Sequence, residues 1–168
     1  SALIVDIGAD RTGITIATNG TAVYTTTLEF GGNTLISALM RERNIDITTA
    51  HQELHAGISA LRTEVFPVLA NALSVLRDEI DRRYIYWHEH KDEFAPLPAI
   101  DTVYLCGGYS TIDGLADYLS ASLKLRIVQS NPWSNCISFD RVIPTLKNDE
   151  AQSYVTAIGL ALSDYLYD

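Results

Sequence analysis

The order of strand-like and helix-like runs limits the possible folds of this chain more than any other feature. Three short β-rich runs lie within residues 2–28, and Asn19-Gly20 between the second and third favours a tight hairpin. Helical spacing follows, and the chain closes with a strand, a helix, a strand and a helix. This alternation predicts an α/β fold with a mixed sheet flanked by helices, not a helical bundle or a sandwich.

A long helical region is expected from about Thr49, because large apolar residues recur at three- and four-residue spacing. The stripe consists of Leu54, Ile58, Leu61, Val65, Leu69, Leu73, Leu76 and Ile80. Pro67 is expected to kink or divide this region, since proline lacks the amide that a helix interior needs. Residues 87–100 are charged and then proline-bearing, which predicts an exposed connection.

The second half of the chain predicts a strand at 101–106, a helix at about 112–123 and a strand at 125–129. The apolar side of the last helix consists of Tyr154, Val155, Ile158, Leu162 and Leu166. We therefore expect a core made of residues 1–31 and 87–168, with a helical inserted subdomain at residues 32–86.

Composition excludes several classes of protein. The 168 residues carry a net charge of −9, with 12 basic against 21 acidic residues, which argues against a nucleic-acid partner. No apolar run approaches the roughly 18–20 residues that span a bilayer, so direct membrane insertion is not expected. Cys106 and Cys136 lack metal-ligand spacing and indicate reduced thiols in the cytoplasm. The start at Ser1, without a methionine, suggests a piece of a longer chain.

A glycine pair, Gly107-Gly108, lies between the strand at 101–106 and the following helix. Glycine lets a ligand approach the backbone closely, and the helix that follows offers free amides and the positive end of its dipole. A tight turn followed by a capping Ser110 or Thr111 explains the pair equally well. Both interpretations stay open from this stretch alone.

A second candidate is the stretch VDIGADRTGITI at residues 5–16. Asp6 ends the first strand, and Gly8 begins a turn whose backbone amides can bind phosphate. Asp6 itself can hold a metal through water. The competing interpretation is a plain hairpin in which Asp6 caps its own turn, because aspartate and glycine are common in turns.

The histidines give a weaker signal. His51 and His55 are four residues apart in HQELH, but Gln52 stands where a metalloprotease has its general-base glutamate. No third ligand lies nearby in the sequence, so surface histidines are the favoured interpretation. The HEH run at 88–90 is interpreted in the same way.

Four stretches together resemble the PilM family of type IV pilus assembly proteins, within the actin-like ATPase superfamily that also contains FtsA. They are DIGADRTGITI, YTTTLEFGGNTLISAL, IDTVYLCGGYSTIDGLADYLSASLKLRIVQSNPW and YVTAIGLAL. They cover most of the chain outside residues 44–100 and 134–150. The resemblance implies the second lobe of an actin-like (ribonuclease H-like) ATPase, with the first lobe absent.

The resemblance implies ATP, with magnesium, bound between two lobes of the full-length protein, and weak or absent binding by this piece alone. The implied phosphate contacts are backbone groups of Gly8, Ala9, Asp10, Arg11 and Thr12. Asp6 would act through magnesium. The implied nucleoside contacts are Gly107, Gly108 and Tyr109. No catalytic residue is assigned.

The resemblance further implies a cytoplasmic protein held at the inner membrane through partners. One partner is the tail of a PilN-like protein, whose site is expected on the missing lobe; other pilus platform proteins and self-association are also compatible. Ala9, Asp10 and Arg11 replace the usual glycine-rich turn, and Gly13 replaces an acidic residue, which puts hydrolysis in doubt more than binding. Arg11 is expected to offset the charge of Asp10. A scaffold without nucleotide function and an FtsA-like cell-division protein remain alternatives.

Overall fold

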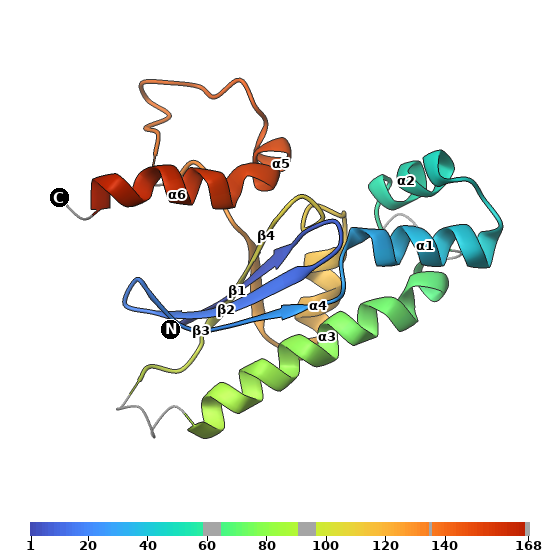
Figure 1. Cartoon of the computed structure of the whole chain (residues 1–168), viewed down its shortest axis with the longest axis horizontal. Coiled ribbons are helices and arrows are strands. Elements are labelled where there is room, and N and C mark those ends of the chain that lie inside the picture. Colours follow the sequence, from blue (N-terminus) through green and yellow to red (C-terminus); the bar gives the residue numbers. More distant parts are fainter. Residues whose placement is uncertain (59–64, 91–96, 135, 167–168) are drawn as a thin grey trace.

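A computed structural model describes residues 1–58, 65–90, 97–134 and 136–166 of the chain (Figure 1). The strands are β1 (Ala2–Ile7), β2 (Thr12–Thr18), β3 (Thr21–Leu28), β4 (Thr102–Cys106) and β5 (Arg126–Gln129). The helical segments are α1 (Gly32–Arg43), α2 (Ile47–His55), α3 (Val65–His90), α4 (Leu115–Leu123), α5 (Asn148–Ala151), the 3-10 turn η2 (Gln152–Tyr154) and α6 (Val155–Leu166). The expected order of strands and helices is confirmed.

The five strands form one mixed sheet in the order β3-β2-β1-β4-β5. β1, β2 and β3 are antiparallel neighbours, so they form the meander that the first 28 residues predict. β4 lies parallel to β1, and β5 lies parallel to β4. Each parallel pair needs a crossover: α1–α3 connect β3 to β4, and α4 connects β4 to β5.

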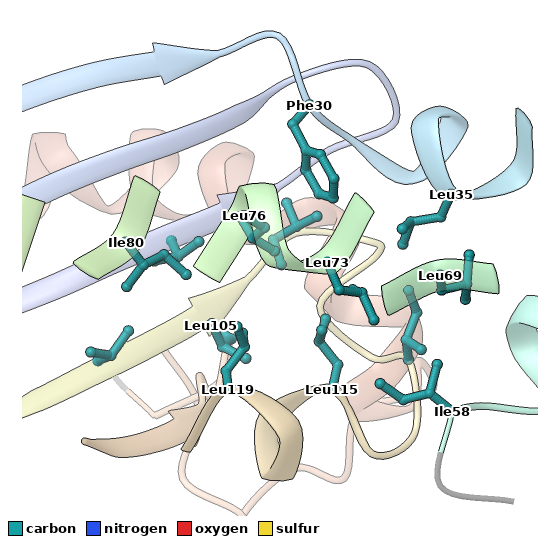
Figure 2. Packing of buried hydrophobic residues seen from close by; sticks show 14 of the residues in the cluster. Phe30, Leu35, Ile58, Leu69, Leu73, Leu76, Ile80, Leu105, Leu115 and Leu119 are labelled. Atoms are coloured by element: carbon teal, nitrogen blue, oxygen red, sulfur yellow. The ribbon is translucent and has the colours of Figure 1, made fainter. Parts of the chain in front are cut away.

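The core lies on one face of this sheet. Leu3, Val5 and Ile7 alternate along β1 and are buried, whereas Asp6 between them points to the opposite face and is partly exposed. The buried face is covered by α3 and α4, and α1 packs against α3. Figure 2 shows Leu76 of α3 and Leu119 of α4 near Leu105 of β4, with Leu35 of α1 beside Leu69 of α3.

The helical region expected from Thr49 is divided, but not at Pro67, where a kink or break was expected. α2 ends at His55, and Gly57 follows with a φ of +92°, which no helix continues through. Pro67 is the third residue of α3, where a missing amide costs little because first-turn amides have no partner in the helix. The predicted position of the break was therefore wrong. Leu61 of the expected stripe lies outside the described residues.

The prediction of an exposed connection at 87–100 was also wrong in part. α3 continues to His90, and both Trp87 and Ile100 are buried in the core. The Trp87 indole donates to the Pro98 carbonyl at 3.3 Å, which ties the end of the helix to the approach of β4. Residues 91–96 lie outside the part of the chain that the structure describes.

The last helix forms, but its apolar side lacks a covering layer. Tyr154 belongs to η2 rather than to α6 and is exposed, and Leu160 of α6 is exposed as well. None of the α6 side chains that the structure describes, up to Leu162, is buried. In Figure 1 this helix runs away from the sheet.

Among those same residues, no helix combines the length and the apolar character that a membrane span requires. α3 begins within the expected inserted subdomain and ends four residues beyond its boundary at 86. The division into a core of 1–31 and 87–168 with an insert at 32–86 remains a prediction.

Two neighbouring positions on α3 test the assignment of the buried face. Leu76 is 1% exposed and Val75 is 53% exposed. Leu76→Ala is expected to lower the free energy of unfolding by about 2–5 kcal/mol, because it removes buried methyl groups and leaves a cavity. Val75→Ala is expected to change it by less than about 0.5 kcal/mol. Urea denaturation followed by circular dichroism measures both, and similar losses would contradict the packing.

Candidate functional site

The parallel pairing of β1 and β4 brings the two candidate turns together. Asp6 lies opposite Cys106 in the register of the two strands, so both strands reach their carboxyl ends side by side. The hairpin at 8–11 leaves β1 at this point, and the glycine turn at 107–109 leaves β4. Loops at the carboxyl ends of neighbouring strands are the usual place for ligands in α/β sheets.

The hairpin between β1 and β2 is closed by its own backbone. The Gly8 amide donates to the Arg11 carbonyl at 2.9 Å, so this amide is not free for a ligand. The buried Thr12 hydroxyl donates to the Phe30 carbonyl at 2.8 Å and ties the hairpin to the start of α1. Within the described residues, the amides of Ala9 and Asp10 donate to no partner, and both residues are exposed.

The start of α1 packs directly on this hairpin. The amides of Gly32 and Asn33 donate to the carbonyls of Gly8 at 3.0 Å and Ala9 at 2.8 Å. The Asn33 side-chain amide donates to the Asp10 carboxylate at 2.8 Å. These contacts hold the turn against the start of α1. They use the carbonyls of Gly8 and Ala9 and leave the exposed amides of Ala9 and Asp10 without a hydrogen bond to the described residues.

Gly31 shows why a glycine is needed at this junction. A Cβ there would lie 2.4 Å from the Ala9 carbonyl oxygen, closer than atoms can approach. Sequence reasoning noted the FGGN run at 30–33 as a family-like feature but did not assign it to the site. A glycine pair immediately before a helix was the available signal, the same signal that singled out Gly107-Gly108.

Tyr109 joins the glycine turn to the hairpin. Its amide donates to the Ile7 carbonyl at 3.1 Å. Its ring lies on Gly32, where a Cβ would come within 2.1 Å of the ring carbons. Gly32 in turn is hydrogen-bonded to Gly8. The two motifs that the sequence placed 100 residues apart are thus in contact through Tyr109 and Gly32.

Gly107 is required by its neighbours as well as by its own conformation. Its φ is +88°, and a Cβ there would lie 2.4 Å from Asp6 Oδ1 and 2.5 Å from the Ile7 carbonyl oxygen. Ser110 Oγ donates to the Gly107 carbonyl at 2.7 Å, and Gln129 Nε2 donates to Ser110 Oγ at 2.8 Å. The hydroxyl of Ser110 therefore closes the turn rather than capping α4, which begins at Leu115.

The C-terminal segment completes the site from the uncovered side of the sheet. Thr156, in the first turn of α6, donates to Asp6 Oδ2 at 3.1 Å. A Cβ on Gly108 would lie 2.8 Å from Ser153 Oγ in η2. Neither Ser153 nor Thr156 was predicted, because no local pattern in the sequence links Thr156 to Asp6, 150 positions away, or Ser153 to Gly108.

Arg11 does not offset the charge of Asp10 in the way expected from the sequence. It pairs with Glu29 at 3.1 Å, with both side chains well exposed. Asp10 instead receives its hydrogen bond from Asn33. The carboxylate is thus held by a neutral amide, which leaves its negative charge in place at the tip of the hairpin.

Cys106 shares its position in the sheet register with Asp6 and is buried. Burial raises the pKa of the Cys106 thiol to about 12, and the Asp6 carboxylate adds to this shift. The thiol therefore stays protonated at neutral pH. Because the thiolate is the reactive form, this cysteine is expected to be inert.

The chemical groups at this edge of the sheet are of the types that bind a phosphate and a magnesium ion. Exposed amides at Ala9 and Asp10 can donate to phosphate oxygens. Asp6 is partly exposed and supplies a carboxylate, with the Thr156 hydroxyl beside it. Magnesium is usually held by one or two carboxylates together with substrate phosphates, so a single carboxylate is adequate. The described part of the chain holds no cluster of three or more histidine, cysteine or acidic residues able to bind a metal alone.

Matched glycine substitutions test the close approach at Gly107. Gly20 has a similar φ of +78°, but a Cβ there would meet nothing within 4 Å. Gly20→Ala is expected to cost about 1–2 kcal/mol of unfolding free energy from backbone strain alone. Gly107→Ala is expected to cost about 1–3 kcal/mol more, because Asp6 and Ile7 must also move. Equal losses in thermal or urea denaturation would disprove the contact.

Thiol titration tests the environment of Cys106. At pH 8 in native protein, Ellman's reagent is expected to modify the exposed Cys136 and not Cys106, whose raised pKa and burial suppress the thiolate. Both thiols should react after unfolding. Cys136→Ser should leave no reactive thiol in the native state, and rapid reaction of that variant would contradict the assignment.

Comparison with known proteins identifies the family. A family model described as type IV pilus assembly protein PilM matches residues 1–165. No curated protein sequence matches the chain.

Solved structures agree with the fold. A chain of a PilM–PilN type IV pilus biogenesis complex superposes with a TM-score of 0.75 at 23% identity, covering 96% of this chain and 45% of that chain. MreB 5 of Spiroplasma citri bound to AMPPNP superposes with a TM-score of 0.65 at 16% identity, and the match covers 99% of this chain and 53% of that chain. The archaeal actin homolog Ta0583 in complex with ADP superposes with a TM-score of 0.61 at 16% identity, and the match covers 98% of this chain and 49% of that chain.

The chain spans about half the length of these solved chains. At such identities the likeness establishes the fold, and it confirms the expected actin-like sheet flanked by helices. The family match covers residues 1–165 of 168, and so the chain belongs to the PilM family of type IV pilus assembly proteins.

Proposed function

We propose that this chain is the nucleotide-binding second lobe of a PilM-like protein and that ATP occupancy sets the affinity of the whole protein for its partners in the pilus assembly platform. The observation that carries the proposal is the contact between the two turns. Tyr109 of the glycine turn lies on Gly32, and Gly32 is hydrogen-bonded to Gly8 of the hairpin. Phosphate and nucleoside contacts are thereby within reach of one ligand.

The roles follow from the groups that remain available. The exposed amides of Ala9 and Asp10 would bind phosphate, while Gly8, Arg11 and Thr12 would shape the hairpin around them. Asp6 would orient magnesium through water. Gly107, Gly108 and Tyr109 would line the nucleoside. Relatives of the same fold bound to AMPPNP and ADP support this choice of ligand.

A second lobe is proposed to close the site. Similar solved chains are about twice as long, since this chain covers 45–53% of them. With half of the phosphate contacts missing, the 168-residue chain alone is expected to bind ATP poorly.

The partner is proposed to be the tail of a PilN-like protein, because one similar structure is a PilM–PilN complex. Binding of that tail would hold the protein at the cytoplasmic face of the inner membrane. Other platform proteins and self-association are further proposals of the same kind. Hydrolysis is not proposed, because Asp10 keeps a negative charge at the tip of the hairpin.

Calorimetry with Mg-ATP on the natural full-length protein tests the proposal. Tight binding is expected for the full-length protein, and weaker binding for residues 1–168. Asp6→Asn is expected to weaken Mg-ATP about 10–100-fold, because the ion loses the carboxylate that orients its water shell. Asp101→Asn makes the same chemical change at the opposite end of β4 and should have no effect. Absence of heat with the full-length protein would refute nucleotide binding.

A nucleotide-independent scaffold is the second candidate. The observation favouring it is that the glycines of the site are explained by protein contacts, Gly107 by Asp6 and Gly108 by Ser153. In that case Asp6→Asn would leave PilN-tail binding by the full-length protein unchanged with and without Mg-ATP. A nucleotide-dependent change in tail affinity that the variant abolishes would exclude the scaffold.

A further inference from the structure

β3 is one of the two edge strands of the sheet, with β5 at the other edge, and it lacks the usual protection of an edge. It is the terminal strand in the order β3-β2-β1-β4-β5 and is eight residues long. Its sequence, TAVYTTTL, contains neither a charged residue nor a proline. Edge strands normally carry such residues because their unpaired amides and carbonyls otherwise pair with another chain.

A β-bulge changes the start of this strand. Ala22 pairs with Ala17 and Tyr24 pairs with Ile16, so Val23 is an extra residue without a partner in the register. Neighbouring residues of a regular strand point to opposite faces. The bulge instead allows Val23 and Tyr24 to line the same cavity.

That cavity has a volume of about 290 Å³ and lies between the start of β3 and the end of α3. It is lined by Val23, Tyr24, Tyr86, Trp87, His90 and Leu97. The lining is mainly apolar and aromatic, which suits one bulky apolar side chain. An unprotected strand edge with an apolar cavity beside it is the combination that binds an extended peptide as an added strand.

Ring contacts hold the cavity walls in place. Tyr86 lies 6.0 Å from Tyr24 and 4.4 Å from His90, measured between ring centroids, and its ring is stacked on His90. Trp87 is buried and bonded to the Pro98 carbonyl. The cavity is therefore formed by residues whose positions are set by packing, which lowers the entropic cost of binding.

Charge indicates which kind of segment fits. The three arginines of α3 are all paired with acidic residues of the same helix, as Arg77–Asp78, Arg82–Glu79 and Arg83–Glu79. In the described part of the chain no ion pair involves Asp81 or Glu89, and Arg82 and Arg83 share Glu79. With four acidic residues against three arginines, α3 keeps a net charge of −1 with its histidines neutral. A second copy, also at −9, would be repelled, whereas a basic segment would be attracted.

We propose that β3 and this cavity bind an extended basic segment of another protein, which adds as a strand to the edge of β3 and places one bulky apolar side chain between Val23 and Tyr86. The surface lies away from the site at the carboxyl end of β1. Ala2, at the start of β1, pairs with Ala17, which pairs with Ala22. The proposal therefore stands or falls independently of nucleotide binding.

The probe is an acetylated nine-residue peptide of alternating threonine and valine, with lysine at both ends and one phenylalanine in the centre. Fluorescence anisotropy measures its affinity, and amide hydrogen exchange locates it. Slower exchange within β3 is expected on binding, because an added strand pairs the free edge. Replacing the phenylalanine by glycine should weaken binding about tenfold, and replacing both lysines by glutamate about fivefold or more.

A matched pair on α3 tests the cavity itself. Tyr86 lines it and is 41% exposed, whereas the adjacent Ile85 is 44% exposed and does not line it. Tyr86→Ala is expected to weaken the peptide about tenfold, and Ile85→Ala less than about twofold. Equal effects of the two variants, or no slowing of exchange in β3 at saturating peptide, would overturn the proposal. A dimer in sedimentation that Val23→Lys dissolves would also overturn it, by making a second copy the occupant.

Discussion

The parallel pairing of β1 with β4 is the interaction on which the site depends. Its register sets Asp6 beside Cys106, so both strands end at the same edge of the sheet. The turns that follow the two strands are therefore in contact. A shift of one residue would turn Asp6 into the core and Ile7 out of it, since side chains alternate along a strand. The buried alternation of Leu3, Val5 and Ile7 makes that shift costly, so the hydrophobic core holds the polar site in register.

The same pairing joins segments that are distant in sequence. The start of α1 is hydrogen-bonded to the hairpin through Gly32 and Asn33, and α6 reaches Asp6 through Thr156. A movement of the hairpin or of Asp6 on ligand binding would therefore displace residues that are hydrogen-bonded to α1 and to α6. These contacts are the ones through which the proposed coupling between nucleotide and partner would pass.

The sequence predicted the strands, the meander and both turns because these depend on local patterns: β-rich runs, Asn19-Gly20, and Gly107-Gly108 after a strand. It placed the helix break at Pro67, since proline disfavours helix interiors, but Pro67 lies in a first turn and the break comes at Gly57. Trp87 was assigned to a loop because charged neighbours surround it. Asn33, Ser153 and Thr156 entered the site only through tertiary packing, which no local pattern records.

The two glycine turns also show what a glycine does and does not establish. Gly107 is needed because Asp6 and Ile7 atoms lie within 2.5 Å of where its Cβ would be, and a Cβ on Gly108 would lie 2.8 Å from Ser153 Oγ. These contacts account for both residues without any ligand, so the glycine pair alone is not evidence of binding. Besides the contact between the two turns, nucleotide binding is supported by groups that packing leaves unused, the exposed amides of Ala9 and Asp10 and the Asp6 carboxylate. Exposed amides at an ordered turn can donate to a ligand in place of water, whereas glycines fitted against their neighbours need no ligand to explain them.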